Sequence, residues 1–298
     1  MSDQTLSNSE GRTIKKSLPT FLKSIKFEHT IFALPFAYLA LFLVEEGLPS
    51  LGNFVWITLA MVGARTFAMG LNRIIDAEVD ARNPRTESRP LASGELSRRD
   101  ALLFSLIALA IFVGATMQLS VLARYLMPVV IIPMVVYPYT KKFTWACHLV
   151  LGLVYLMVPP AVWIAVTGQM PLGIVMMGVG AGFWVAGFDI LYTCQDLDSD
   201  REQGIHSMVV TFGLEHAMDI AWYFHMATVF SIALAGFLLE LGPFYYMGVI
   251  AFILLLKHEH QIISPQNLSR VNEAFFTMNG IVSVVFFIFV AGDALLWS

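Results

Sequence analysis

Asn72, Asp76 and Asp80 follow one another at intervals of four residues in the segment Asn-Arg-Ile-Ile-Asp-Ala-Glu-Val-Asp. This spacing places the three side chains on one stripe of a helix. Carboxylate and amide oxygens are hard ligands of the kind that Mg²⁺ prefers, and Mg²⁺ keeps several waters and binds phosphate oxygens. The segment therefore predicts a divalent-cation site at one end of a helix.

A second acidic segment repeats the pattern, with Asp196 and Asp200 four residues apart and Asp189 seven residues before Asp196. Either segment alone is explained equally well as solvated acidic side chains of a loop. Two of them, each with arginines close by and each extending an apolar segment, favour a functional site, because carboxylates at a membrane edge are costly. The sequence predicts two carboxylate stripes that face each other across a cavity and share divalent cations, which relieve their repulsion.

The composition indicates a membrane protein. Of the 298 residues 57% are hydrophobic and 13% are charged, and the mean hydropathy is +0.70, whereas about a quarter of the residues of soluble domains are charged. The net charge of -4 gives no reason to expect a nucleic-acid partner. Two cysteines are too few for a disulfide framework.

Apolar stretches long enough to cross a bilayer recur along the chain. They predict an all-α bundle of nine transmembrane helices with cytoplasmic Asp-rich loops, formed by a single domain over 24–298 that follows a polar cytoplasmic tail over 1–23. The small-residue run at 178–182 predicts close helix contact, and Pro159-Pro160 predicts a kink. The predicted spans are 27–44, 52–72, 101–119, 121–138, 148–167, 171–192, 216–239, 243–258 and 274–295.

The basic residues of the connecting segments alternate along the chain. They gather in the N-terminal tail and in every second loop, while the opposite loops contain only Arg124. By the positive-inside rule, the N-terminus and both acidic segments are cytoplasmic, and the C-terminus lies outside. The expected location is the inner (plasma) membrane.

The two acidic segments together resemble the signature of the UbiA superfamily of intramembrane prenyltransferases, whose patterns are NDxxDxxxD and DxxYxxxDxxxD. The resemblance extends over about residues 20–295. Segment 88–91 fits an NRPL-like stretch of the family, 137–142 resembles its YPxxKR, and Arg65 matches an arginine often found there. The motif positions present in this chain are Asn72, Asp76, Asp80, Asp189, Tyr192, Asp196 and Asp200.

The resemblance implies an enzyme that ionises a polyprenyl diphosphate with Mg²⁺ and alkylates an electron-rich aromatic acid, with the prenyl tail reaching into lipid. The implied catalytic residues are Asp76, Asp80, Asp189, Asp196 and Asp200. The implied metal ligands are Asn72, Asp76, Asp80, Asp196 and Asp200, with Asp189 assisting or contacting the phenol. Arg89, Lys141 and Arg201 are implied to bind the diphosphate, and Arg65, Tyr137 and Tyr192 the acceptor.

Arg73 departs from the family pattern, which has an aspartate at this position. Residue 73 is rotated by about 100° from residue 72, away from the stripe of Asp76 and Asp80, so we expect metal binding to survive. Arg73 is expected to snorkel or to pair with Glu78 or a phosphate. The surrounding residues resemble a bacterial branch commonly labelled 4-hydroxybenzoate polyprenyltransferase.

Other functions compete with this interpretation. A transporter or ion pathway would explain intramembrane acids, but such acids are expected near mid-membrane rather than at one face. CDP-alcohol phosphotransferases are also Asp-rich, yet their compact Asp-Gly and Ala-Arg motif does not follow Asp76 or Asp196. Within the resemblance, 1,4-dihydroxy-6-naphthoate of a menaquinone pathway is an alternative acceptor. The sequence does not indicate the acceptor, the prenyl length or the oligomeric state.

Overall fold

The computed structural model describes residues 17–27 and 30–297, and these residues form helices joined by loops, with a single isolated bridge between Ser264 and Asn267 as the only β-type pairing among them. The predicted all-α class is confirmed. Residues 1–16, most of the predicted polar tail, lie outside the described residues.

The chain divides into two compact units, which are described separately. Unit 1 comprises Met1–Thr30 and Leu59–Gly114, and unit 2 comprises Ile31–Thr58 and Ala115–Ser298, in each case as far as the residues are described. One of the divisions falls within a single long helix, α3 (Leu51–Asp80).

Unit 1 contains most of α3, the loop that follows it and α4 (Arg98–Thr116). Residues 17–24 are helical, and Phe21 is only 1% exposed. Phe21, which falls within the predicted polar tail, therefore belongs to the core of unit 1. That core consists of Phe21, Ile25, Ala77, Leu91, Leu96, Ala101 and Phe104.

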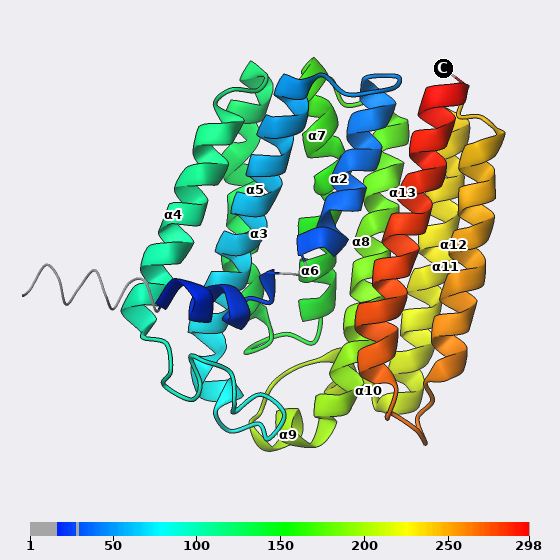
Figure 1. Ribbon diagram of the computed structural model, residues 1–298. Helices are drawn as coiled ribbons and strands as arrows, with labels where there is room; N and C mark the ends of the chain where they lie inside the picture. The colour runs from blue at the N-terminus through cyan, green and yellow to red at the C-terminus, as the bar shows by residue number, and fades with distance from the viewer. Residues whose placement is uncertain (1–16, 28–29, 298) are drawn as a thin grey trace, which may run out of the picture. The chain divides into compact units, whose positions relative to one another are not determined.

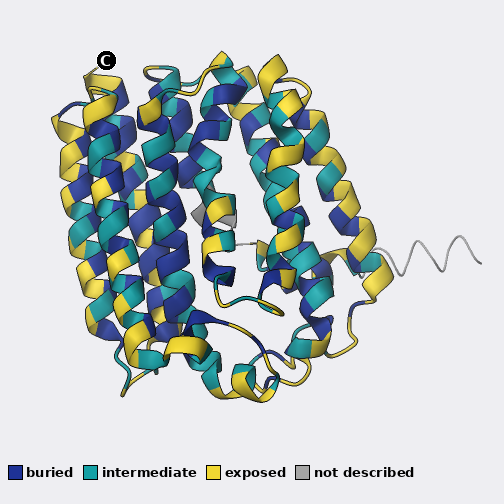
Figure 2. Cartoon of the chain, turned by 180° about the vertical axis from the view of Figure 1, so that it is seen from behind, coloured by how far each residue is buried: buried dark blue, intermediate teal, exposed yellow. Residues whose placement is uncertain are grey.

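Unit 2 is a larger set of helices (Figure 1). Its helix α8 packs against α6 and α11, α11 packs against α12, and α12 packs against α13. Buried residues line the sides on which these helices meet (Figure 2). The elements are α2 (Thr30–Val44), α5 (Val121–Thr140), α6 (Cys147–Leu156), α7 (Val158–Thr167), α8 (Leu172–Thr193), a 3₁₀ turn η2 (Cys194–Asp196), α9 (Leu197–Glu202), α10 (Met208–Phe212), α11 (Leu214–Leu238), α12 (Pro243–Ile262), a π-helical segment η3 (Glu273–Met278) and α13 (Asn279–Leu296).

Glycines set the separation of α6 and α8. A Cβ atom added to Gly182 would lie 2.8 Å from the carbonyl oxygen of Gly152, and one added to Gly152 would lie 2.6 Å from that of Gly182. Real Cβ atoms do not approach an oxygen so closely, so the two backbones touch only because both residues lack a side chain. The close contact predicted for the 178–182 run is confirmed.

Each of the nine predicted spans is largely helical over its described residues. Seven helical segments of the described chain are long and apolar enough to cross a membrane. Of the other two, the apolar part of α2 is shorter, at Leu34–Val44, and α12 carries charged residues near its end. The chain is thus a multi-span helical protein, and the count of nine spans stays a prediction. The predicted kink is confirmed, because α6 ends at Leu156 and α7 starts at Val158 with a proline in its first turn.

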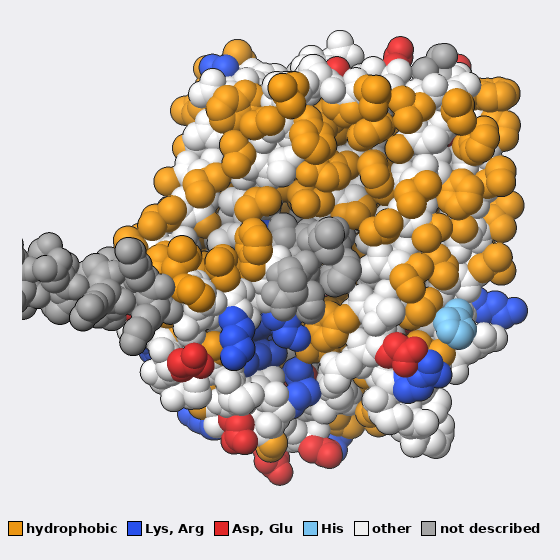
Figure 3. All heavy atoms as spheres, viewed as in Figure 1, with side chains coloured by type: hydrophobic (Ala, Val, Ile, Leu, Met, Phe, Trp, Pro, Cys, Tyr) orange, Lys and Arg blue, Asp and Glu red, His pale blue; other side chains and the backbone are white. Residues whose placement is uncertain are grey.

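The segments that follow α5, α9 and α12 lie at one end of unit 2 (Figure 1). The loop after α5 and the segment after α9 are joined there by a hydrogen bond from the His206 amide to the Lys141 carbonyl, 2.7 Å long. The α12–η3 connection lies at the same end of unit 2 (Figure 1). Hydrophobic side chains cover the wall of α13, and charged side chains gather below it (Figure 3).

Candidate active site

The first acidic motif occupies the last turns of α3. The helix continues without a break to Asp80, so the predicted stripe of Asn72, Asp76 and Asp80 is confirmed. Asp76 is 3% exposed and Asp80 is 6% exposed. Carboxylates as deeply buried as these need cations nearby, because burial without a partner is strongly unfavourable.

Two arginines supply positive charge to Asp80. Arg89 donates from Nη1 to Oδ1 of Asp80 at 2.7 Å, and Nη1 of Arg73 lies 3.9 Å from Oδ2. Thr86 donates its hydroxyl to the Asp80 carbonyl at 3.0 Å, which closes the loop back onto the end of α3. The loop therefore brings Arg89, a predicted diphosphate ligand, directly to the motif.

Arg73 also anchors the N-terminal helix of unit 1. Its Nε donates to the carbonyl of Ser24 at 3.1 Å, and the residue is 8% exposed. Glu78, the acid that the sequence offered as a partner, accepts a hydrogen bond from Arg98 at 2.9 Å on the exposed side of α3. The residue that departs from the family pattern thus links residues 17–24 to the acidic motif.

Arg65 lies seven residues before Asn72 on α3, about 10 Å from it along the helix axis. It is half-buried, and its Nη2 donates to the carbonyl of Lys26 at 3.4 Å. A guanidinium held at this depth suits a carboxylate ligand, because it stays charged and can bind both oxygens.

The second acidic motif lies in unit 2, and its helix is interrupted. Helix α8 ends at Thr193, a 3₁₀ turn covers Cys194–Asp196, and α9 begins at Leu197. Gln195 donates its side-chain amide to the Tyr192 carbonyl at 2.9 Å, which satisfies an acceptor near the end of the α8 ladder. Asp189 therefore belongs to α8, Asp196 to the 3₁₀ turn and Asp200 to α9, so the regular helix expected from Asp189 to Asp200 is interrupted by one 3₁₀ turn.

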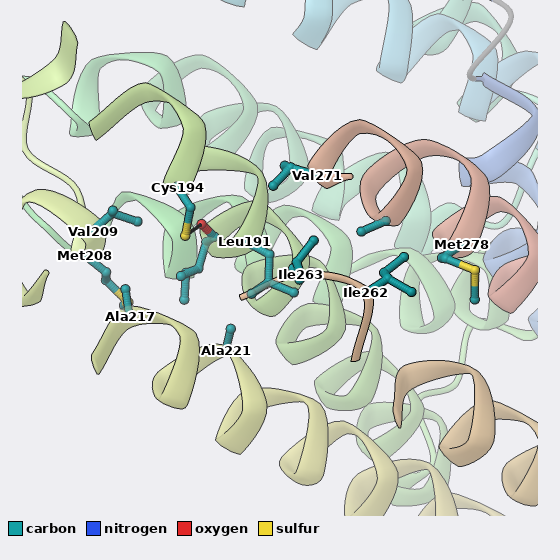
Figure 4. Packing of buried hydrophobic residues seen from close by; sticks show 12 residues of the cluster. Leu191, Cys194, Met208, Val209, Ala217, Ala221, Ile262, Ile263, Val271 and Met278 are labelled. Atoms are coloured by element: carbon teal, nitrogen blue, oxygen red, sulfur yellow. Dashed lines mark hydrogen bonds between the residues drawn. The ribbon is translucent and has the colours of Figure 1, made fainter. Parts of the chain in front are cut away.

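A hydrophobic cluster holds the end of α8 in place (Figure 4). Side chains from α8, α10, α11, α12 and η3 meet there with Cys194 of the η2 turn. Because helices from several parts of the chain share this cluster, the turn that carries Asp196 is supported on its buried side. Its labelled members are Leu191, Cys194, Met208, Val209, Ala217, Ala221, Ile262, Ile263, Val271 and Met278.

Asp189 has a partner that the sequence did not reveal. Its Oδ2 lies 2.7 Å from Nδ1 of His148, which belongs to the first turn of α6. His148 is 2% exposed, and its Nε2 has no hydrogen-bond partner among the described residues. A histidine next to a cysteine at a helix start carries no signal of this contact, which depends on α6 and α8 being neighbours.

Lys141 also belongs to unit 2. It follows the last residue of α5, is half-buried, and its carbonyl accepts from the His206 amide. Cys147 donates its thiol to the His206 carbonyl at 3.5 Å. The start of α6, Lys141 and the segment after α9 are therefore tied together, whereas Arg201 is exposed on α9.

Tyr192 packs against the π-helical segment η3. Its ring centroid lies 4.0 Å from that of Phe275 and 5.9 Å from that of Phe276. Tyr137 lies on α5, half-buried, and its carbonyl accepts from the hydroxyl of Thr140. The two tyrosines predicted to line the acceptor site are thus on different helices of unit 2, and Tyr192 is part of an aromatic group that suits a cationic intermediate.

Metal binding at the acidic motifs would depend on pairs of carboxylates. Among the described side chains, no three of His, Cys, Asp or Glu lie close enough together to hold a metal ion. Mg²⁺ bound to a phosphate needs only one or two carboxylates and completes its octahedron with water and phosphate oxygens. Asp76 and Asp80, buried one turn apart, fit that requirement for unit 1, and Asp196 and Asp200, which are half-buried, offer a second pair in unit 2.

The Lys257–His260 segment, another group with metal-ligand types, is used for packing. Glu259 is fully buried and accepts from the amide of Asn279 at 3.0 Å. His260 points elsewhere, with Nε2 at 2.8 Å from Nδ1 of His225. Glu259 and His260 therefore have separate partners, Glu259 on α13 and His260 on α11.

The comparisons with known proteins decide the family. A family model described as the UbiA prenyltransferase family matches residues 33–281. The chain belongs to this family. A curated "4-hydroxybenzoate octaprenyltransferase" of Shewanella oneidensis is 31% identical over 258 residues, which is 86% of this chain and 89% of the relative. A protein of the same name in Shewanella woodyi is 29% identical and covers 90% and 94% of the two chains.

Solved structures show the same fold. The apo structure of a UbiA homologue from Aeropyrum pernix has a TM-score of 0.81 and 30% identity, covering 90% of this chain and 98% of that one. A UbiA homologue from Archaeoglobus fulgidus, bound to GPP and Mg²⁺, has a TM-score of 0.72 at 20% identity and covers 92% and 99%. This UbiA-family chain is accordingly a membrane prenyltransferase.

Proposed function

We propose that this enzyme transfers a polyprenyl group from a polyprenyl diphosphate to a hydroxylated aromatic acid of the 4-hydroxybenzoate type, in an Mg²⁺-dependent reaction of quinone biosynthesis. The observation that carries the proposal is the buried pair Asp76 and Asp80 with Arg89 at 2.7 Å from Asp80. The names of the curated relatives support the choice of acceptor.

Each acidic motif would supply oxygen ligands to Mg²⁺. Asp76 and Asp80, assisted by Asn72, would provide oxygen ligands from α3, and Asp196 and Asp200 would provide them from η2 and α9. When bound, Mg²⁺ neutralises charge on the leaving diphosphate and so makes it a better leaving group. Buried carboxylates suit this task because their negative charge is costly without compensation, and a bound divalent cation compensates it.

Basic side chains would take the remaining phosphate charge. Arg89 is the best placed, since its ion pair with Asp80 holds it at the motif and its side chain remains 20% exposed. Lys141 is fixed by the backbone bond to His206, and Arg201 lies on α9 beside Asp200 in the chain. Such preorganised cations stabilise charge that grows as the carbon–oxygen bond breaks.

Acceptor alkylation makes different demands on the residues. The allylic carbon–oxygen bond breaks with its electron pair leaving on the diphosphate, and a ring carbon ortho to the hydroxyl forms the new carbon–carbon bond as the ring loses a proton. Arg65 would bind the acceptor's carboxylate, and Tyr137 and Tyr192 would shield the allylic cation from water. The prenyl tail would run along apolar helix faces into lipid.

The alternation of charge in the loops supports a reaction at the cytoplasmic face of the plasma membrane, with the N-terminus inside, by the positive-inside rule. Both acidic motifs are then on the side where soluble aromatic acids and Mg²⁺ are supplied.

The test is to incubate membranes that contain the enzyme with labelled octaprenyl diphosphate, Mg²⁺ and a panel of aromatic acids. Product with 4-hydroxybenzoate supports the proposal. Product only with 1,4-dihydroxy-6-naphthoate would replace the acceptor, and no product with any aromatic acid would refute the proposal.

Matched variants distinguish a specific metal-binding role of the acidic residues from a general effect of negative charge near the motifs. Asp76→Asn and Asp196→Asn should each lower kcat by at least about 100-fold. Asp198→Asn and Glu78→Gln, which change exposed acids next to the same motifs, should leave turnover near that of the wild type. Turnover that persists in the presence of a metal chelator would contradict the proposed metal-binding role.

A further inference from the structure

A buried carboxyl group of α12 contacts the start of α13, directly after the π-helical segment η3. Oε1 of Glu259 accepts from Nδ2 of Asn279 at 3.0 Å, and Glu259 is fully buried. The second oxygens of the two groups, Oε2 of Glu259 and Oδ1 of Asn279, are also buried and have no hydrogen-bond partner among the described residues. Buried polar atoms nearly always have partners, so two exceptions in one contact call for a reason.

The orientation of the Asn279 amide is fixed by its other contacts. Nδ2 also donates to the carbonyls of Ala274 and Phe275, each at 3.2 Å. An amide turned the other way would place Oδ1 against these two carbonyl oxygens and against Oε1 of Glu259, and oxygens of this kind only accept. Oδ1 therefore remains an acceptor that needs a donor.

The surroundings of Glu259 favour its neutral form. Lys257 and His258 on the same helix are exposed, Arg270 forms an ion pair with Glu273 at 2.6 Å, and no basic side chain among the described residues is paired with Glu259. A carboxyl group buried without a cation takes up a proton, because the buried charge is too costly.

One proton accounts for both oxygens that lack a partner. A protonated carboxyl group donates from one oxygen and accepts at the other, and a primary amide does the same with its nitrogen and its oxygen. If Oε2 of Glu259 carries the proton, Oε2 can donate to Oδ1 of Asn279 while Oε1 accepts from Nδ2. An ionised Glu259 would instead leave two acceptors facing the same amide.

This pair holds the turn that carries Phe275 and Phe276. π-Helical turns are rare and are frequent at functional sites. The carbonyls of Ala274 and Phe275 accept from the Asn279 side chain, while the Asn279 backbone amide donates to the Phe276 carbonyl. The shape of the turn therefore depends on the Asn279 side chain, whose amide is held in place by Glu259.

The rings of this turn pack beside Tyr192. The centroid of Phe275 lies 4.0 Å from that of Tyr192, 5.3 Å from that of Phe188 and 4.6 Å from that of Phe276. All four rings are half-buried, so the group is partly open. Tyr192 precedes Asp196 by four residues, which places these rings near the acidic end of α8.

We propose that Glu259 is a neutral acid that donates from Oε2 to Oδ1 of Asn279, and that this pair positions Phe275 and Phe276 beside Tyr192 for prenyl transfer. Glu259 and Asn279 are positioning residues, because they act through the turn. Their effect on catalysis rests on the proposed function, in which Tyr192 shields the allylic cation, whereas the hydrogen-bonded pair does not depend on it.

The first test compares two replacements of Glu259 in the full-length enzyme in micelles, with kcat expressed per folded enzyme. Glu259→Gln supplies the same donor and acceptor as the neutral acid, so its kcat should stay near the wild-type value. Glu259→Met has a similar volume but neither group, and its kcat should fall about 10-fold, since cation–π contacts of this size are lost when the rings shift. The KM for the diphosphate should stay near the wild-type value in both variants.

Asp293→Ala is the matched control for a merely structural effect. Asp293 is also a buried carboxylate between α12 and α13, but it accepts from the amides of Gly242 and Tyr245 at the other end of α12. This variant should be less stable than the wild type and should keep the wild-type kcat per folded enzyme. An equal fall in kcat for Asp293→Ala and Glu259→Met would overturn the positioning role.

Infrared spectroscopy tests the protonation of Glu259 without any turnover. The difference spectrum between the wild type and Glu259→Gln at neutral pH should contain the carbonyl band of a protonated carboxyl group. The bands of an ionised carboxylate in its place, or a kcat of Glu259→Gln as low as that of Glu259→Met, would overturn the neutral pair.

Two further outcomes are decisive. If Glu259→Met does not fold, Asn279→Asp takes its place, because it keeps the size of the side chain but loses the donor to η3, and an unchanged kcat would overturn the positioning role. A wild type that forms no product with any aromatic acid would overturn the proposed function and the catalytic role of the pair, while the infrared band still decides whether the pair exists.

Discussion

Replacing Arg73 by methionine should destabilise unit 1 by much more than the removal of an ordinary surface arginine. Arg73→Met keeps most of the side-chain volume but removes the donor to the Ser24 carbonyl and a positive charge 3.9 Å from Asp80. The arginine is 8% exposed, so water does not replace what is lost. The N-terminal helix over 17–24 would lose its polar link to α3.

The size of the effect follows from the two contacts. A buried carbonyl left without a donor costs about 1–3 kcal/mol. The ion pair adds less, of the order of 1 kcal/mol, because Arg89 at 2.7 Å already neutralises Asp80. The expected loss is therefore about 2–4 kcal/mol. Arg73→Asp should lose more, about 3–5 kcal/mol, since it buries a further carboxylate next to Asp76 and Asp80.

The free energy of unfolding can be measured in mixed micelles by titration with a denaturing detergent, followed by tryptophan fluorescence. Arg98→Met is the matched control, because its ion pair with Glu78 is 2.9 Å long but both side chains are more than half exposed. Such a pair contributes at most about 1 kcal/mol. Equal stability of Arg73→Met and Arg98→Met would refute the anchoring role. Mg²⁺ that stabilises Arg73→Asp more than the wild type would show that position 73 is a metal ligand after all.

Three further predictions test other parts of the structure. Gly182→Ala would place a Cβ atom 2.8 Å from the Gly152 carbonyl oxygen, so α6 and α8 must separate. We expect the free energy of unfolding to fall by about 1–3 kcal/mol and turnover to decrease. Gly114→Ala on α4 is the control, because the added atom meets nothing within 4 Å. Asp293→Ala removes the carboxylate of α13 that accepts hydrogen bonds from the amides of Gly242 (2.8 Å) and Tyr245 (3.1 Å) at the start of α12. The free energy of unfolding should fall by about 1–2 kcal/mol in the same titration. Asp293→Asn should lose less, because its side-chain oxygen still accepts a hydrogen bond. Arg65→Gln should raise the KM for the aromatic acid far more than the KM for the diphosphate in steady-state assays, and equal changes in both would place Arg65 on the other substrate.

Local spacing was sufficient to predict several features of the fold. The interval of four residues between Asn72, Asp76 and Asp80 becomes a stripe because α3 is a regular helix to its end. The proline pair at Pro159-Pro160 breaks the helix where it should, since a proline cannot donate to the preceding turn. These features need only the geometry of a single helix, so the order of the residues is enough to reveal them.

Local spacing did not predict the interruption of the helix in the second acidic motif. Periodicity predicts one stripe from Asp189 to Asp200, but the Gln195 side chain binds the Tyr192 carbonyl and the helix changes to a 3₁₀ turn. Whether a polar side chain turns back onto its own backbone depends on the space around it. Here that space is set by side chains of α10, α11, α12 and η3, which come from other parts of the chain.

The partners of the site residues were decided by packing alone. His148 meets Asp189 only because two glycines let α6 and α8 touch, and Arg73 meets the Ser24 carbonyl only because residues 17–24 fold back onto α3. The rotation and register of one helix against another arise from the summed contacts of many side chains, and no local pattern encodes them. The residue types and spacing therefore determined which chemistry this chain can perform, while the tertiary structure determined which neighbours hold those residues in place.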